Sequence, residues 1–191
     1  MWEEKPLSNV SPVMDRDHVL SDGMLIRIEP LRRGDRSAVV GLFARLSAES
    51  RLRRFLSPKS SLSDRKVAFL TDVERVDRAA MTAVDVRDGS VLGIARYVEY
   101  VGRPGVADAA VAVADDVQRR GIGTALMLRL IACARANGLQ QLTATTLWEN
   151  RAARALMRRA GFQARGSAGA EIELALELGP TIRRAPGPVR S

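Results

Sequence analysis

The sequence predicts a single α/β (α+β) domain in which helices flank a central, mixed and mostly antiparallel twisted sheet. Its length of 191 residues suits one hydrophobic core, and 46% hydrophobic with 27% charged residues is typical of a globular chain. The predicted elements follow the order β, three helices, then β-β-β-α-β-α-β. Strands that are neighbours in sequence, with helices between the later ones, are typical of a helix-covered mixed sheet.

The first third of the chain is predicted to contain one strand and three helices. Residues 1–20 show no sustained hydrophobic period and are expected to form a mobile arm. Met24–Glu29 alternates apolar and polar side chains, which predicts a strand. Apolar residues at helical spacing after Gly34 predict an amphipathic helix. Ser47–Phe55 and Ser63–Leu70 predict two short helices, the second with a serine N-cap.

The middle of the chain is predicted to form three consecutive strands. Ala79–Val86 and Val91–Tyr100 are rich in residues that favour strands, and the Asp88-Gly89 turn between them is a strong hairpin signal. Asp108–Ala114 follows a glycine-containing loop and is expected to be the third strand. The hairpin predicts that at least part of the sheet is antiparallel.

The last third alternates helices and strands. It contains four predicted elements, which are a nearly all-apolar helix at Gly121–Asn137, a strand at Gln141–Leu147, a helix at Asn150–Ala160 and a strand at Glu171–Leu178. The three prolines within residues 180–191 predict a disordered tail. Residues 21–179 are therefore expected to form the folded domain.

The charge of the chain is unevenly distributed. Its 30 basic and 22 acidic residues give a formal net charge of +8. Residues 118–165 hold 9 basic residues and 1 acidic residue, whereas residues 67–117 hold 5 basic and 9 acidic ones. The basic segment predicts an anion-binding side of the molecule, and a solvated basic surface without a ligand is the alternative.

Several classes of site and location are excluded or disfavoured by composition. The single cysteine, Cys133, excludes an intrachain disulfide and a cysteine-based zinc site, and no metal site is predicted. The single histidine, His18, argues against a Ser-His-Asp triad. No apolar run is long enough to span a membrane, and the first ten residues, MWEEKPLSNV, do not look like a secretory signal. A cytoplasmic protein that does not contact membranes is expected.

A strand, a polar loop and a glycine-containing helix start stand together at Val111–Thr124. The N–H groups of the first helical turn lack partners within the helix, and the helix dipole adds positive charge there. Gly121 and Gly123 allow an anion to approach this backbone closely, and Arg119 and Arg120 add full charges. The segment lacks the third glycine of a dinucleotide fingerprint and the Gly-Lys-Ser/Thr of a P-loop. A pyrophosphate site and a purely structural turn are both consistent with Gly-x-Gly alone.

Two longer motifs carry a family resemblance. Gln118-Arg119-Arg120-Gly121-Ile122-Gly123, placed after a strand, resembles the Gln/Arg-x-x-Gly-x-Gly/Ala loop of the GNAT family of N-acetyltransferases. Asn150, Leu156 and Gly161-Phe162 resemble the later Asn-x-x-Ala…Leu…Gly-Phe segment of that family. The resemblance covers residues 24–178. It implies the GNAT fold and acetyl-CoA as cosubstrate.

Four further segments resemble the Pat-type bacterial protein lysine acetyltransferases, and these are Leu25–Pro30, Arg45–Arg51 with Arg54-Phe55, Gly93–Tyr97 and Val113–Asp116. This resemblance implies acetyl transfer to protein lysines by direct attack in a ternary complex, with an acyl-CoA synthetase as a candidate protein substrate. The alternatives are acetylation of a small-molecule amine and a weakly active or non-catalytic acyl-CoA-binding domain. Nucleic-acid binding is disfavoured because the sequence lacks an aromatic stacking pattern. Monomer and homodimer both remain open.

The resemblance also implies which residues bind the cosubstrate. The backbone of one strand is expected to hydrogen-bond the pantetheine arm, beside a neighbouring strand that diverges to make room. The loop and helix start are expected to hold the pyrophosphate. Asn150 is expected near the thiol end of the ligand, with a helix N-cap as a compatible second role. The residues concerned are Val111, Ala112 and Val113 for the arm, and Gln118, Arg119, Arg120, Gly121, Ile122, Gly123 and Thr124 for the pyrophosphate.

Asp108 is the candidate general base, because it occupies the position where Pat-type enzymes have a glutamate. A carboxylate that only caps the start of the strand is the alternative, and Glu99 is a weaker candidate for the base. The position where many GNAT enzymes have a proton-donating tyrosine is Met157, which has no proton to give. Tyr97 and Tyr100 are candidates for the acceptor site, one of them expected in the core. The acidic segment around Asp108 is expected to face a cationic amine, opposite the basic side for the phosphates.

Overall fold

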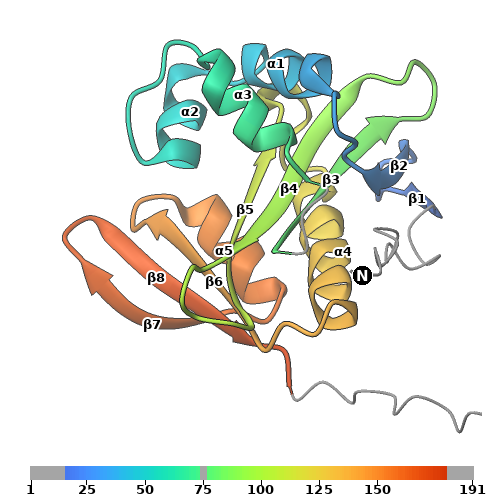
Figure 1. The fold of residues 1–191 in the computed structure, drawn as a ribbon. Coiled ribbons are helices and arrows are strands. Elements are labelled where there is room, and N and C mark those ends of the chain that lie inside the picture. Colours follow the sequence, from blue (N-terminus) through green and yellow to red (C-terminus); the bar gives the residue numbers. More distant parts are fainter. Residues whose placement is uncertain (1–15, 74–76, 180–191) are drawn as a thin grey trace, which may run out of the picture.

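The structure is a computed structural model and describes residues 16–73 and 77–179. Over these residues the chain forms one eight-stranded sheet flanked by helices (Figure 1). The strands are β1 (Arg16–Val19), β2 (Leu25–Pro30), β3 (Arg78–Asp85), β4 (Val91–Glu99), β5 (Val106–Val113), β6 (Gln141–Leu147), β7 (Gln163–Ala168) and β8 (Glu171–Glu177). The helices are α1 (Arg36–Ala44), α2 (Ala48–Phe55), α3 (Asp64–Thr71), α4 (Ile122–Ala136) and α5 (Arg151–Arg159), with a 3₁₀ turn at Asp115–Val117.

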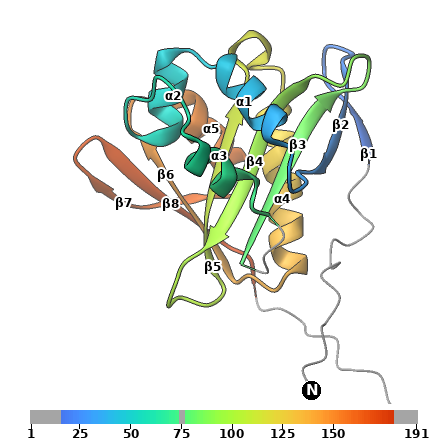
Figure 2. The ribbon, with the colours of Figure 1, turned by 45° about the horizontal axis from the view of Figure 1, so that its top comes forward.

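The strand order is β1-β2-β3-β4-β5-β6-β8-β7, and each neighbouring pair is antiparallel except β5 and β6. The predicted mixed, mostly antiparallel sheet is therefore confirmed. Helices α1–α3 lie on one face of the sheet and α4 on the other, as the two ribbon views show (Figures 1 and 2). Helix α5 contacts α4, and its residues line the cleft described below.

The main core lies between α4 and strands β2–β5. Helix α4 is apolar on almost every side because it is covered on almost every side, and nine of its residues are buried. Leu126, Met127 and Leu130 are among its fully buried side chains, and they pack with strand residues such as Ile26 and Tyr97. Cys133 is a free, buried thiol on the same helix. The nearly all-apolar helix predicted for this segment is confirmed, and the structure shows that most of it is buried.

The predicted helices and the longer strands are confirmed within two residues at each end. Ser63 caps α3 as expected, because its hydroxyl accepts a hydrogen bond from the backbone N–H of Lys66 at 3.3 Å. Two strands were not predicted, β1 and β7. Both are edge strands with polar sequences, and all six residues of β7 are exposed, so neither carries the alternating pattern that signals a strand.

The prediction of a mobile arm over residues 1–20 is wrong for the last residues of that range. Arg16–Val19 forms β1 and pairs antiparallel with β2, so backbone hydrogen bonds order a segment that lacks a hydrophobic signal. Leu20, which follows, is buried. Residues 1–15, and the predicted disordered tail at 180–191, lie outside the described residues.

No helix in the described part of the chain is long and apolar enough to cross a membrane. Within the same residues, no group of three or more His, Cys, Asp or Glu side chains is arranged to hold a metal ion.

Candidate active site

Strands β5 and β6 separate part of the way along the sheet. Their parallel pairing covers only Val106–Asp108 against Gln141–Thr143, although both strands continue beyond it. On its other edge β5 stays paired with β4 as far as Val113. The backbone of residues 109–113 therefore has one edge without a strand partner (Figure 1). An extended ligand can hydrogen-bond to this edge as an added strand does.

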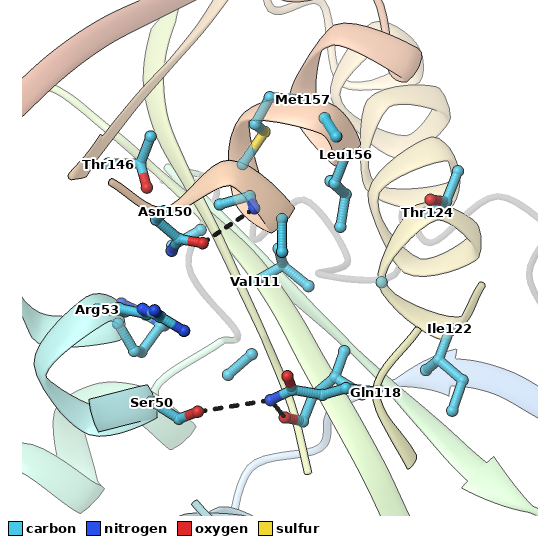
Figure 3. Close-up of a pocket in the computed structure, with 18 of the residues that line it drawn as sticks. Ser50, Arg53, Val111, Gln118, Ile122, Thr124, Thr146, Asn150, Leu156 and Met157 are labelled. Atoms are coloured by element: carbon cyan, nitrogen blue, oxygen red, sulfur yellow. Dashed lines mark hydrogen bonds between the residues drawn. The ribbon is translucent and has the colours of Figure 1, made fainter. Parts of the chain in front are cut away.

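A cleft of about 540 Å³ opens at this separation. Figure 3 shows Ser50 and Arg53 of α2 on one side of it and Asn150, Leu156 and Met157 of α5 on the other. Ten of the eleven residues predicted to bind the cosubstrate line the cleft, and they are Val111, Ala112, Val113, Gln118, Arg119, Gly121, Ile122, Gly123, Thr124 and Asn150. The volume lies within the usual range for a ligand site.

Arg120 is the predicted residue that the structure does not bring to the cleft. Its guanidinium forms an ion pair with Asp22, in the turn between β1 and β2. Arg119, its neighbour, lines the cleft and has a backbone φ of 61°. The left-handed conformation of a non-glycine residue is costly and indicates that the local structure imposes this orientation.

The start of α4 presents backbone N–H groups to the cleft. Helices α2 and α5 each begin with a side chain that accepts a hydrogen bond from the first turn, whereas α4 begins at Gly121 with no side-chain cap. Gly121 has a φ of 97°, and residues 121–124 all line the cleft. Because an uncapped helix start attracts negative charge, this end of the cleft suits a phosphate group.

Replacement of Gly121 by alanine is expected to lower the free energy of unfolding by about 1–2 kcal/mol, because the left-handed conformation is unfavourable for a residue with a Cβ. The affinity for acetyl-CoA should fall as well, since the same backbone forms the helix start. Gly41→Ala is the matched control, because Gly41 is exposed on α1 with open space around its Cβ position. It should stabilise the chain by about 0.5–1 kcal/mol. Chemical denaturation measures the stability of the two variants. Equal stabilities would contradict the assigned cost of the left-handed conformation at Gly121.

The loop before α4 is tied to α2 by side chains. The amide nitrogen Nε2 of Gln118 donates to the carbonyl oxygen of Val113 at 3.1 Å and to Asp115 at 2.8 Å. It also donates to the Ser50 hydroxyl at 3.5 Å (Figure 3). Asp115 also accepts a hydrogen bond from the backbone N–H of Ser47 at 3.0 Å. Gln118 therefore holds the loop against the strand and against α2. This role was not predicted, because its partners on α2 are distant in sequence.

Asn150 caps α5 from the wall of the cleft. Its Oδ1 accepts a hydrogen bond from the backbone N–H of Ala153 at 3.1 Å (Figure 3). The predicted N-cap role is therefore confirmed, and contact with the cosubstrate remains a prediction.

Two substitutions of Asn150 separate these roles. Asn150→Ala should lose about 1 kcal/mol of stability, whereas Asn150→Ser keeps a capping oxygen and should lose little. If the amide also contacts acetyl-CoA, both variants should show a raised KM for acetyl-CoA. Thermal unfolding and steady-state kinetics give the two readouts, and a normal KM in the serine variant would limit Asn150 to capping.

Asp108 lies on β5 at the last position that pairs with β6. Because side chains alternate along a strand, it shares a face with Ala110 and Ala112, and this face is covered by α1–α3. Its half-buried carboxylate makes no hydrogen bond or ion pair with any described residue. Burial raises the pKa of Asp108, and the positive charges of Arg54 and Arg96 oppose that shift. Asp108 itself does not line the cleft, but Arg54 and the neighbouring Ala109 and Ala110 do.

The other candidates for proton transfer are placed differently. Tyr97 is 1% exposed, and its hydroxyl accepts a hydrogen bond from Asn137 at 2.7 Å, which confirms a core role for one tyrosine. Tyr100 is partly exposed, with its hydroxyl 3.0 Å from Oγ1 of Thr143. The carboxylate of Glu99 accepts from the backbone N–H of Gly105 at 2.7 Å and so holds the β4–β5 loop. Met157 is buried on the cleft wall.

The charges around the cleft are more positive than the sequence predicted. Among the described residues, those that line the cleft include four arginines, Arg53, Arg54, Arg119 and Arg159, and no carboxylate. The acidic segment was expected to face a cationic amine, but four of its carboxylates form ion pairs with nearby arginines. Arg78 binds Asp72 and Asp77, Arg87 binds Asp85, and Arg45 binds Asp116. That expectation is therefore corrected, with Asp108 as the exception.

Comparisons with known proteins agree with this architecture. The chain is 34% identical over 160 residues to acetyltransferase PA5475 of Pseudomonas aeruginosa, an alignment that covers 81% of this chain and 86% of that protein. It is 31% identical over 134 residues to acetyltransferase Pat of Mycolicibacterium smegmatis, covering 70% of this chain and 40% of that longer protein. The structure of the GNAT domain of S. lividans PAT superposes with a TM-score of 0.79 at 27% identity, over 85% of this chain and 96% of that domain.

The chain thus spans well under two thirds of the M. smegmatis protein and nearly all of the S. lividans domain. Residues 48–162 match the acetyltransferase (GNAT) family, and this range contains the loop before α4, the capped start of α5 and every residue that lines the cleft except Leu46. The chain therefore belongs to the GNAT family of acetyltransferases, which use acetyl-CoA as the acetyl donor.

Proposed function

We propose that the enzyme transfers the acetyl group of acetyl-CoA to the side-chain amine of a protein lysine, by direct attack in a ternary complex. The observation that carries this proposal is the carboxylate of Asp108, unpaired and half-buried at the point where β5 leaves β6. The similarity to Pat of M. smegmatis and to the GNAT domain of S. lividans PAT supports the choice of this acceptor class. A cytoplasmic acyl-CoA synthetase is the proposed type of protein substrate.

The cleft suits acetyl-CoA in shape and charge. The unpaired edge of β5 is suited to the amide groups of the pantetheine arm, and the uncapped start of α4 with Arg119 is suited to the pyrophosphate. Gly123 leaves this end of the cleft narrow but open, since a Cβ there would stand 2.7 Å from Cδ1 of Leu156 and 3.4 Å from Cγ2 of Val113. When bound, the thioester supplies an activated acetyl group.

The acceptor amine must lose a proton before it can attack the thioester. A lysine side chain has a pKa of about 10.4, so nearly all lysine amines are protonated at neutral pH and cannot attack. In the proposed reaction Asp108 removes this proton, directly or through one water molecule. The positive charges of Arg54 and Arg96 further favour the neutral amine. As the new C–N bond forms and the C–S bond breaks, the nitrogen releases a second proton to solvent. The thiolate takes a proton from solvent, because Met157 has none to give.

Incubation with acetyl-CoA and a purified acyl-CoA synthetase tests the proposal, with mass spectrometry to locate acetyl-lysine. Transfer that depends on the enzyme supports it. Transfer to small amines alone would favour the small-molecule alternative and overturn the lysine assignment. Bound acetyl-CoA with no transfer to any amine would favour a non-catalytic acyl-CoA-binding domain. Isothermal titration with CoA in parallel shows that the protein used is folded and competent.

A further inference from the structure

A side pocket of about 40 Å³ adjoins the main cleft on the face that carries Asp108. Residues of α1, α2 and α3 line it, together with residues of strands β4 and β5. Leu46, Arg54 and Ala112 line both spaces, so the two are continuous past these three residues. Nine of its eleven lining residues are apolar, and the other two are Arg54 and Arg96. The pocket is therefore a mostly apolar, half-open space with two arginines in its lining.

Arg96 is an unusual residue for such a space. It is 5% exposed, and its Nη1 is buried without a hydrogen-bond partner. The ring of Phe69 stacks 4.7 Å from its guanidinium carbon and covers it without accepting a strong hydrogen bond. A buried N–H group of a charged side chain is costly when no acceptor is present. The described residues therefore provide no acceptor for the Nη1 group of Arg96.

The charges near this pocket do not balance. Arg78, which also adds positive charge near Arg96, is already paired with Asp72 and Asp77. Lys66 lies near Arg54 and Arg96 and adds further positive charge. Asp108 is the carboxylate that interacts with both arginines, and it forms an ion pair with neither. In the proposed reaction Asp108 becomes neutral as it takes the proton, and the two arginines then lose that counter-charge.

We propose that Arg54 and Arg96 bind a carboxylate of the acceptor, supplied by an Asp or Glu side chain next to the lysine that is acetylated. This inference rests on the proposed function and specifies its substrate. The pocket has a volume of about 40 Å³, which is room enough for a carboxylate group. A carboxylate there accepts hydrogen bonds from both guanidinium groups and restores the charge balance when Asp108 is protonated.

Paired peptides test this inference. The peptides are identical except that the residue beside the acceptor lysine is Glu, Gln or Lys. The wild-type enzyme is expected to acetylate the Glu peptide with a kcat/KM about ten- to hundredfold above that of the Gln peptide, the range expected for hydrogen bonds between charged groups. The Lys peptide should be the poorest substrate. A set of free α-amino acids is assayed beside them, because their α-carboxylate has the same chemistry.

Variants of Arg54 separate recognition from folding. Arg54→Gln should remove most of the preference for Glu, and Arg54→Glu should reverse it toward the Lys peptide, a change that a structural defect does not produce. Arg53→Gln is the matched control on the same helix, because Arg53 lines the cleft but not the side pocket, and it should keep the ratio between the Glu and Gln peptides. Arg96→Lys, assayed with the same peptides and followed by thermal unfolding, tests the contribution of the buried Arg96.

The outcomes separate the two proposals. Equal kcat/KM for the Glu and Gln peptides would overturn the carboxylate subsite and leave lysine acetylation intact. A preference that survives in Arg54→Glu would also overturn it. Efficient acetylation of free amino acids with little transfer to peptides would assign the pocket to an α-carboxylate and overturn the peptide form. Transfer to no peptide and no amino acid, with acetyl-CoA still bound, would overturn the proposed function and this inference with it.

Discussion

Asp108→Asn is expected to lower kcat by about 10²–10⁴-fold while the affinity for acetyl-CoA stays nearly unchanged. The asparagine side chain has almost the same shape but cannot take a proton, so only the chemical step should suffer. Asp108 lies outside the lining of the main cleft, which is why cosubstrate binding should survive. Single-turnover kinetics and CoA titration measure the two effects separately. A comparable loss of CoA affinity would show that Asp108 acts on the fold of β5 instead.

The pH dependence has a definite sign. The reactive form of Asp108 is the carboxylate, and burial raises its pKa above the ordinary value for aspartate. Activity should therefore be present above this raised pKa and fall as the pH decreases through it. The inflection at this pKa should disappear in Asp108→Asn, whose residual activity should rise steadily with pH through the titration of the acceptor amine alone. The same inflection in this variant would assign the titration to another group.

Asp108→Glu tests whether reach limits the reaction. Glutamate extends the carboxylate by one methylene, about 1.5 Å, toward the acceptor. An increase in kcat would indicate that the wild-type carboxylate acts at a distance, through water. A decrease would indicate that the pocket near Arg54 and Arg96 is already matched to the shorter side chain, with overpacking as the physical cause.

The central elements of this fold were predictable because burial leaves a pattern in the sequence. Helix α4 is recognised by its apolar length, and the β3–β4 hairpin by Asp88-Gly89 between strand-forming runs. Strands β1 and β7 carry no such pattern, since edge strands need only backbone hydrogen bonds on one side. Their existence follows from their partners β2 and β8 and not from their own residues.

The candidate site was predictable where it depends on local backbone and not where it depends on distant partners. The strand, loop and helix start formed by residues 111–124 are contiguous, so one motif identifies them. Arg119 and Arg120 are equivalent in the sequence, and only Asp22, 98 positions away from Arg120, determines which one leaves the cleft. Arg96 resembles an ordinary polar residue of a strand. Its burial depends on α3, which places Phe69 over its guanidinium group.

Gly93→Ala is expected to have the largest effect on stability among the single methyl additions considered. A Cβ at Gly93 would stand 2.9 Å from the backbone oxygen of Ala112, 3.0 Å from Cδ1 of Leu126 and 3.3 Å from Cγ2 of Val113. The first of these contacts cannot be relieved by a side-chain rotation. Strand β5 must move away from β4, at a cost of about 1–3 kcal/mol or more. Since Ala112 and Val113 form the wall of the cleft, the affinity for acetyl-CoA should fall together with the stability.

The matched control is Gly166→Ala, the same change in strand β7. Its Cβ would meet only Oε2 of Glu173, at 3.9 Å, which is ordinary contact with a flexible side chain. Stability and CoA affinity should both stay near the wild-type values. Chemical denaturation and CoA titration of the two variants decide the matter. If Gly93→Ala is as stable as Gly166→Ala but binds CoA weakly, β5 moves without loss of packing. The close approach of β4 and β5 is then needed for the shape of the cleft and not for stability. If both properties of Gly93→Ala match the wild type, the contact between Gly93 and Ala112 does not control the position of β5.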